Sequence, residues 1–128
     1  MTMNKAVYGT RFFAELFYST DESLHKRIFL QKFRKRFTSA VVIHEIYRLA
    51  LKREGRETAK LKVALIKKDF EIIPVDEQIA QLSAEFRQNC NLSMGDSMIA
   101  ATALTLKAVC ITDDPHFKQI NEIETEWI

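Results

Sequence analysis

The chain has 128 residues, 47% of them hydrophobic and 28% charged, with a formal net charge of +2. This size and composition are typical of one globular domain over residues 1–128, and the scarcity of glycine and proline favours long regular elements. No apolar stretch approaches the roughly 20 residues that cross a bilayer, and no secretory signal is evident, so we expect a cytoplasmic protein without membrane contact.

Short apolar, β-branched runs alternate with longer helical patterns. In chain order we expect a strand at residues 5–8, helices at 10–19 and 21–36, a very short strand within 37–42, helices at 42–55 and 56–68, a strand at 70–75, helices at 77–88 and 94–107, a strand at 108–112, a turn at 113–120 and an edge strand within 122–128. Thr20 or Asp21 and then Asp76 are suitable helix caps. Strands separated by helices predict an α/β fold with a parallel sheet and helices on both faces.

Asp96 occupies an unusual position, because it lies one turn before Ile99 on the apolar side of its predicted helix. Aspartate is rarely buried without a partner. Glu45 lies in the opening turns of another helix that follows a strand, and Asp114 comes just after the strand at 108–112. The carboxyl ends of parallel strands share one edge, so the sequence predicts that Glu45, Asp96 and Asp114 meet there.

Three carboxylates in one cleft repel one another and raise each other's pKa values unless a cation neutralises them. Mg²⁺ suits such a site, because it binds through one or two carboxylates and keeps several waters beside a substrate phosphate. The ion can polarise a phosphoryl oxygen and lower the pKa of a bound water. This chemistry indicates phosphodiester hydrolysis.

Each acid also has a structural interpretation. Ser93 and Asp96 match a loose capping box, in which Asp96 would only stabilise the start of its helix. Glu45 would suit a helix surface, and the Asp113–Asp114–Pro115 segment is a good turn sequence. Each signal is weak alone, and only the shared placement of the acids at one edge favours the metal site.

At these residues the sequence resembles the PIN-domain nucleases, especially the VapC-type toxins of prokaryotic toxin–antitoxin pairs. The resemblance rests on the glutamate in "VVIHEIYRLAL", on Asp-x-x-Ile-Ala-Ala-x-Ala-Leu from Asp96 to Leu104, and on Thr-x-Asp-x-x-Phe at Thr112, Asp114 and Phe117. It covers almost the full chain. It implies a PIN-like three-layer α/β fold, with a short parallel β-sheet flanked by helices.

The resemblance also implies an activity and a site. Such proteins typically cleave RNA with Mg²⁺ or Mn²⁺, often as homodimers held by a protein antitoxin. Asp96 would be the principal metal ligand, Asp114 would bind the metal directly or through water, and Glu45 would hold a metal water or act on the nucleophile. Thr112 would hydrogen-bond the carboxylates from the strand end. Asp113 is less suitable than Asp114, because the family places the acid two residues after the threonine.

Gly9 departs from the family pattern, in which the first strand is followed by an aspartate and then by Thr or Ser. Here Gly9 precedes Thr10, and the loss of one carboxylate should lower metal affinity by about 10- to 100-fold or more. Gly9 is consistent with an inactivating change or with decay into a binding-only module; rescue by Glu15 from the next helix is the least favoured explanation. The leading hypothesis is an impaired ribonuclease, and the alternative is a catalytically silent module that binds RNA or a protein.

Other features carry less information. The basic side chains are either solvated helix faces or a phosphate track into the acidic cleft, and they would also suit an acidic antitoxin tail; they are Arg11, Lys26, Arg27, Lys32, Arg34, Lys35, Arg36, Lys60, Lys62, Lys67 and Lys68. Several phenylalanines are expected in the core or a dimer interface, namely Phe12, Phe13, Phe17, Phe29 and Phe33. Cys90 and Cys110 are expected to be free thiols, and His25, His44 and His116 have no shared metal-ligand spacing.

Overall fold

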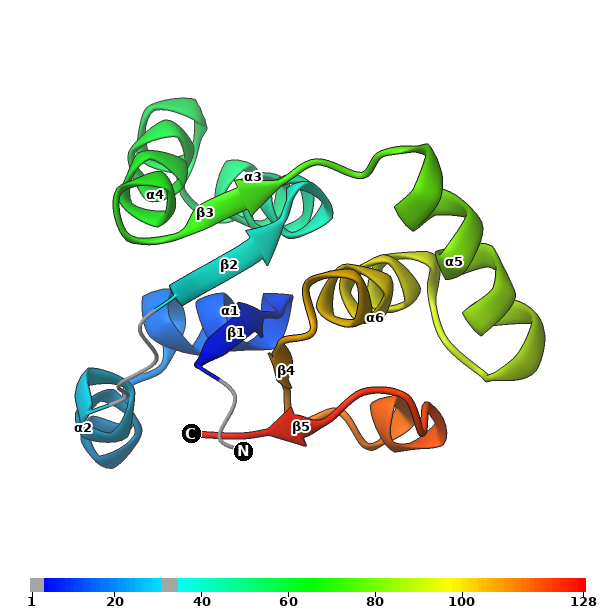
Figure 1. Ribbon diagram of the computed structural model, residues 1–128. Coiled ribbons are helices and arrows are strands. Elements are labelled where there is room, and N and C mark those ends of the chain that lie inside the picture. Colours follow the sequence, from blue (N-terminus) through cyan, green and yellow to red (C-terminus); the bar gives the residue numbers. More distant parts are fainter. Residues whose placement is uncertain (1–3, 31–34) are drawn as a thin grey trace.

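A parallel five-stranded sheet organises the chain, in a computed structural model that describes residues 4–30 and 35–128. Its order is β3-β2-β1-β4-β5, and every neighbouring pair is parallel. The strands are β1 (Lys5–Tyr8), β2 (Lys35–Ser39), β3 (Glu71–Ile73), β4 (Val109–Ile111) and β5 (Thr125–Glu126). Figure 1 shows them side by side from β3 at the top to β5 at the bottom. The expected α/β fold with a short parallel sheet is confirmed.

Six α-helices and one 3₁₀ helix surround the sheet in the described part of the chain. They are α1 (Thr10–Tyr18), α2 (Glu22–Leu30), α3 (Ala40–Glu54), α4 (Arg56–Asp69), α5 (Glu77–Asn89), α6 (Met94–Leu106) and the 3₁₀ helix η1 (Pro115–Gln119). In Figure 1, α4 lies beside the β3 edge, whereas α5 lies beyond α6 at the opposite end of the molecule from α2. Within residues 4–30 and 35–128, no helix is both long enough and apolar enough to cross a membrane.

The centre of the sheet forms the core, because β1 and β4 are buried along almost their whole length. Ala6, Val7 and Tyr8 are at most 1% exposed, as expected of strands covered on both faces. Burial of the Tyr8 phenol raises its pKa to about 12. The Tyr8 ring packs edge-on against Phe12 and Phe70, at centroid distances of 4.6 and 5.0 Å. These contacts join α1 and the junction between α4 and β3 to the central strand.

The strand order reverses between β1 and β4. From β1 the chain passes to β2 and then to β3 on one side, and α5 and α6 return it to β4 on the other side of β1. The ladder between them continues past Tyr8, since the Gly9 N–H donates to the carbonyl of Ile111 at 3.2 Å. In open α/β sheets, ligands bind beyond the carboxyl ends of the strands at such a reversal. The residues after β1 and β4 therefore border the expected ligand site.

The second predicted helix was too long. Asp21 caps α2 as one of the two expected residues, with its Oδ1 accepting from the Ser23 N–H at 2.9 Å, but the helix ends at Leu30. Lys35 and Arg36 belong to β2, where they pair with Lys5 and Ala6 of β1, because sheet pairing overrides a local helical pattern. Lys32, Phe33 and Arg34 lie outside the described residues. A single basic helix face over residues 26–36 is therefore wrong, and only its first two cations, Lys26 and Arg27, lie on α2.

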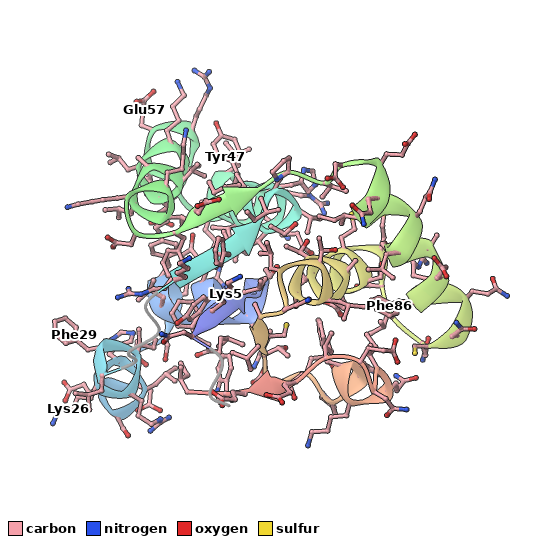
Figure 2. All side chains as sticks on the ribbon, in the orientation of Figure 1. Lys5, Lys26, Phe29, Tyr47, Glu57 and Phe86 are labelled. Carbon is pink, nitrogen blue, oxygen red and sulfur yellow. The ribbon has the colours of Figure 1, made fainter. Side chains whose placement is uncertain are left out.

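Smaller differences affect the other predicted elements. The segment predicted as a strand at residues 70–75 forms only the three residues of β3, and the final edge strand is the two-residue β5. The helix predicted from residue 42 begins two residues earlier, at Ala40. Phe12 and Phe13 are buried as expected, and Phe17 packs against the core. Phe29 is 91% exposed, and Figure 2 shows it projecting outward from α2, so it lies outside the core, and its expected alternative place in a dimer interface stays a prediction.

Candidate metal site at the sheet edge

Three separate elements bring the predicted acids to the carboxyl edge of the sheet. Glu45 lies in the second turn of α3, which starts directly after β2 and is capped by Ser39, whose Oγ accepts from the Val41 N–H at 3.1 Å. Asp96 lies in the first turn of α6, and Asp114 lies in the turn that follows β4. We call Glu45, Asp96 and Asp114 the acidic edge.

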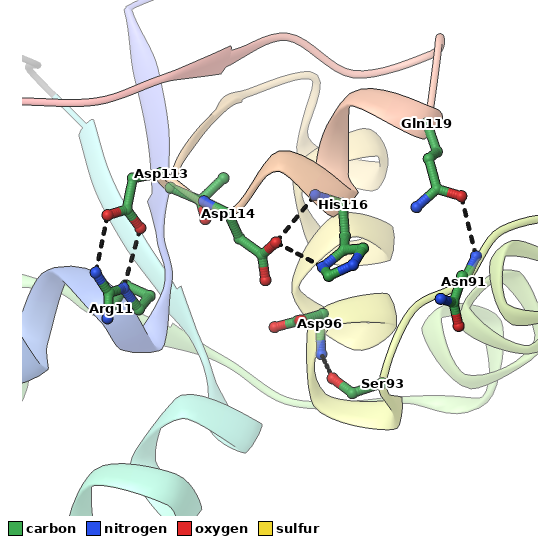
Figure 3. Close-up of polar contacts among 9 residues, drawn as sticks. Arg11, Asn91, Ser93, Asp96, Asp113, Asp114, His116 and Gln119 are labelled. Carbon is green, nitrogen blue, oxygen red and sulfur yellow. Dashed lines mark hydrogen bonds and ion pairs between the residues drawn. The ribbon is translucent and has the colours of Figure 1, made fainter.

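Asp96 faces Asp114 across this edge, as Figure 3 shows. Burial raises the pKa of the Asp96 carboxyl, and the negative charge of Asp114 raises it further. The Ser93 hydroxyl acts against this pKa shift, while the charge of Glu45 adds to it. Ser93 also caps α6, since its Oγ accepts from the Asp96 N–H at 3.1 Å. Ser93 therefore provides the cap, and the Asp96 carboxyl faces Asp114 while it also lies beside the Ser93 hydroxyl, so the capping interpretation and the acidic edge are compatible.

Asp114 is held in place by its own turn. Its Oδ1 accepts from the His116 N–H at 2.9 Å and lies 2.8 Å from His116 Nδ1. Its backbone N–H donates to Thr112 Oγ1 at 3.1 Å. Thr112 thus contacts the backbone of Asp114, whereas we expected its hydroxyl to bond the carboxylates. The turn interpretation of this segment and the placement of Asp114 at the acidic edge are compatible.

The Glu45 carboxylate lies near the start of α6, where Thr10 binds it and Gly95 leaves space for it. The Thr10 hydroxyl donates to Glu45 Oε1 at 2.6 Å. A Cβ atom added to Gly95 would lie only 3.1 and 3.2 Å from the two Glu45 carboxylate oxygens, so glycine leaves the space that the carboxylate occupies. The positive end of the α6 dipole favours a negative charge at this place.

Asp113 is not part of the acidic edge. Its carboxylate accepts two hydrogen bonds from Arg11, at 3.0 Å from Nε and 2.9 Å from Nη2, which Figure 3 shows as a forked pair. The hydrogen bond from Arg11 lowers the pKa of Asp113 against a smaller opposing effect of burial. Arg11 also lies 3.9 Å from Glu15 Oε1. Glu15 is thus directed at Arg11, and this contact does not support a rescue of the missing carboxylate.

Gly9 stands where the resemblance implies the first acid of the pattern, an aspartate directly after the first strand. Its backbone is extended, with φ −86° and ψ 177°, which any residue adopts. A Cβ atom there would meet the Ile111 carbonyl oxygen at 3.4 Å and two Ile99 carbon atoms at 4.0 Å, which are ordinary contacts. Neither the backbone nor the Cβ position excludes an aspartate, so what Gly9 removes is a charge.

The acidic edge fits a hydrated divalent cation better than a fully protein-bound one. Within residues 4–30 and 35–128, no group of three or more Asp, Glu, His or Cys side chains could hold a metal ion as it stands. Mg²⁺ needs only one or two direct carboxylates with water in its other positions, and Asp96 and Asp114 provide that donor set. Metal binding by Glu45, Asp96 and Asp114 stays a prediction.

Sequence reasoning missed the residues that hold the acids. Thr10 and Glu45 are 35 residues apart, and Arg11 and Asp113 are 102 residues apart, so neither pair has a local signal. His116 was dismissed for lack of metal-ligand spacing, although an Asp-Pro-His sequence favours a turn in which the first side chain bonds the third residue. Cys90 and Cys110 are free thiols as expected, and burial, with a smaller contribution from Asp96, raises the pKa of Cys110 to about 12.

The model of the PIN-domain family matches residues 10–123 of the chain. The chain therefore belongs to the PIN-domain family, and its fold is the PIN fold.

Several solved toxin structures share this fold. VapBC2 from Rickettsia felis, bound to a DNA fragment from its promoter, is 19% identical with a TM-score of 0.81, over 97% of this chain and 98% of that one. A toxin–antitoxin complex from Klebsiella pneumoniae is 23% identical with a TM-score of 0.75, over 96% and 99%. Mycobacterium tuberculosis VapC20, described as a toxin that cleaves the sarcin–ricin loop, is 20% identical with a TM-score of 0.75, over 88% and 92%. Among curated protein sequences, no significant match is found.

Proposed function

We propose that the chain is a VapC-like endoribonuclease that depends on Mg²⁺ or Mn²⁺ and that Gly9 weakens it. One observation carries the proposal: Asp96 and Asp114 face each other at the strand-order reversal, close enough for Asp114 to raise the pKa of Asp96. Like charges gathered at a ligand-binding edge are typical of a site that a cation completes. Membership of the PIN-domain family supports a nuclease.

The similar structures support the biological setting of this proposal. Several of them are complexes of a toxin with its antitoxin. We therefore propose a protein antitoxin as the partner of this chain, RNA as its substrate and a homodimer as its assembly.

The chain's own residues have separate tasks in the proposed reaction. A bound divalent ion would supply charge neutralisation at the phosphate and would acidify a water. Asp96 and Asp114 would hold that ion, and the Asp114 turn, with Thr112 and His116, fixes one of the two carboxylates. Glu45, oriented by Thr10, would accept a proton from the attacking water or hold it by a hydrogen bond.

A catalytically silent module is the second candidate, and Gly9 is the observation that favours it. Removing one carboxylate lowers the negative charge that attracts the ion, and outer-sphere losses alone reduce metal affinity by about 10- to 100-fold. Such a protein would keep the fold and bind RNA or a protein partner without cleaving RNA.

Restoring the missing acid distinguishes the two candidates. We expect Gly9→Asp to raise Mn²⁺-dependent cleavage of a generic single-stranded RNA by at least about 10-fold over the wild-type chain, because metal occupancy rises. The measurement is product formation on denaturing gels over a metal titration. Gly9→Asp combined with Asp96→Asn is the matched control and should be inactive, which excludes a contaminating nuclease. Absence of cleavage by Gly9→Asp at every metal concentration would favour the silent module.

A further inference from the structure

A cavity of about 500 Å³ adjoins the acidic edge on the side of α3. It is lined by Thr10, His44, Glu45, Arg48, Leu49 and Lys52. Thr10 and Glu45 form the hydrogen-bonded pair described above, so one end of the cavity opens at a predicted catalytic carboxylate. The remaining lining residues extend from this end along α3.

Arg48 and Lys52 form a row on this wall of the cavity, which we call the cationic row. They are four residues apart and therefore lie on one face of α3, separated by about 6 Å along the helix axis. Both side chains are exposed. The row begins three residues after Glu45, so the cations line the approach to the acidic edge.

The cationic row has no internal partner in the part of the chain that the structure describes. Other cations nearby are engaged: Arg11 pairs with Asp113, Lys62 with Glu54, and Arg53 lies 4.5 Å from the centre of the Tyr18 ring. The side chains of Arg48 and Lys52 form no hydrogen bond, ion pair or ring contact with another described residue. Two unpaired cations in a cavity that ends at a carboxylate indicate a site for an anionic ligand.

We propose that the cationic row binds successive backbone phosphates of a single RNA strand whose scissile phosphate lies at the acidic edge. This inference rests on the proposed ribonuclease function and extends it to the path of the substrate. Repeated cations on one helix face suit a polymer with regularly repeated charge, and phosphate contacts fix the position of a strand without reading its sequence. The guanidinium of Arg48 can bind a phosphate through two parallel hydrogen bonds. An acidic protein segment is the competing occupant.

The test is RNA binding without metal, so that no cleavage occurs. A fluorescently labelled single-stranded RNA is titrated with the wild-type chain in EDTA, and the dissociation constant is measured by anisotropy at several KCl concentrations. For Arg48→Gln/Lys52→Gln we expect the slope of log K against log salt to become shallower by about 1.4, or 0.7 for each lost phosphate contact. The ratio of the variant's dissociation constant to that of the wild-type chain should therefore be about 25-fold larger in 0.1 M salt than in 1 M salt.

Arg56→Gln/Lys60→Gln is the matched control. It removes the same two residue types at the same spacing, from exposed positions on α4 that do not line this cavity. We expect its slope to stay within about 0.3 of the wild-type slope. Equal losses in both double variants, or unchanged binding in the Arg48/Lys52 variant, would overturn the proposal. The same holds if the wild-type chain binds no RNA, or if the Arg48/Lys52 variant loses only binding of a poly-glutamate peptide.

A second readout separates this inference from the proposed function. In the Gly9→Asp background, Arg48→Gln/Lys52→Gln should raise KM for RNA and leave kcat within about twofold, because the row binds the strand away from the reacting phosphate. If Gly9→Asp is inactive but the salt dependence of RNA binding changes as expected in Arg48→Gln/Lys52→Gln, the nuclease proposal fails and RNA binding by the cationic row is still supported. An unchanged KM together with unchanged slopes would reject the RNA path alone.

Discussion

Asp96 destabilises the metal-free fold at neutral pH, because its carboxyl is partly buried beside two other acids. Its folded-state pKa is raised above the ordinary value of 3.8 by burial first and then by the charge of Asp114. The penalty is absent below pH 3.8, grows as the pH rises, and is complete above the raised pKa. A bound cation would remove the penalty, which links the stability of the acidic edge to its occupancy.

Asp96→Asn should therefore stabilise the metal-free protein at pH 7, because the amide carries no charge and has no repulsion to relieve. The gain in the free energy of unfolding should shrink towards zero as the pH falls to about 4. Urea unfolding in EDTA at a series of pH values measures this difference. A variant that is less stable than the wild-type chain at pH 7 would show that the Asp96 carboxylate mainly stabilises the start of its helix.

Asp113→Asn is the matched control for this measurement and has the opposite sign. Arg11 lowers the folded-state pKa of Asp113, so the pair stabilises the protein above the ordinary carboxyl pKa, and this stabilisation is lost as the pH falls through the lowered one. The Asp113 side chain is 31% exposed and that of Arg11 is 58% exposed. Solvent screening should therefore limit the loss in Asp113→Asn to less than about 1 kcal/mol at pH 7.

At the scale of elements, the junction of α3 and α6 decides where Glu45 lies. The junction depends on Gly95, because a Cβ atom there would lie 3.1 and 3.2 Å from the two Glu45 carboxylate oxygens and would push that carboxylate aside by a few tenths of an ångström. Glycine is a poor helix former, so its presence in the first turn of α6 lowers the stability of the helix. The close approach of the Glu45 carboxylate explains why glycine is present there despite this cost. The sequence at this position is suited to the site and not to the helix.

Gly95→Ala should separate stability from function. Alanine is the better helix former by up to about 1 kcal/mol, and the Glu45 side chain can rotate away, so the melting temperature should stay the same or rise. Displacing Glu45 should weaken Mn²⁺ binding by about 10-fold or more in the Gly9→Asp background. Calorimetric titration with Mn²⁺ measures the affinity. Equal affinity with and without the alanine would show that the position of Glu45 does not matter for the metal.

The elements also show what the sequence could reveal. The segments at β1, β4 and α6 could be predicted because their burial gives them a strong apolar pattern. Asp96 lies in the first turn of α6 and Asp114 follows β4, so these two acids could be placed from the same pattern. The predicted end of the second helix was wrong because the local sequence around Lys35 and Arg36 has a helical pattern, although both residues pair with β1 in the sheet. Thr10, Arg11 and Gly95 were missed because their contacts exist only after distant segments have folded together.

At the scale of the whole molecule, metal binding should appear as thermal stabilisation. At a free Mn²⁺ concentration of 100 times its dissociation constant, Gly9→Asp should gain about 2.7 kcal/mol. The wild-type chain, with an affinity about 10- to 100-fold lower, should gain only about 0.4 to 1.4 kcal/mol at the same concentration. Melting followed by circular dichroism measures both, and Asp96→Asn should show almost no gain. Equal gains in all three proteins would indicate binding elsewhere on the surface.

The extended backbone and ordinary Cβ contacts of Gly9 have a genetic consequence. Two of the four glycine codons become aspartate codons by a single base change, so one point mutation can supply the absent acid without rebuilding its surroundings. If that acid restores a harmful activity, cells that carry the aspartate mutation and lack a protective partner would grow poorly and be lost from the culture. Sequencing the gene from long-term cultures grown with and without that partner would therefore show whether aspartate at position 9 accumulates only when the partner is present.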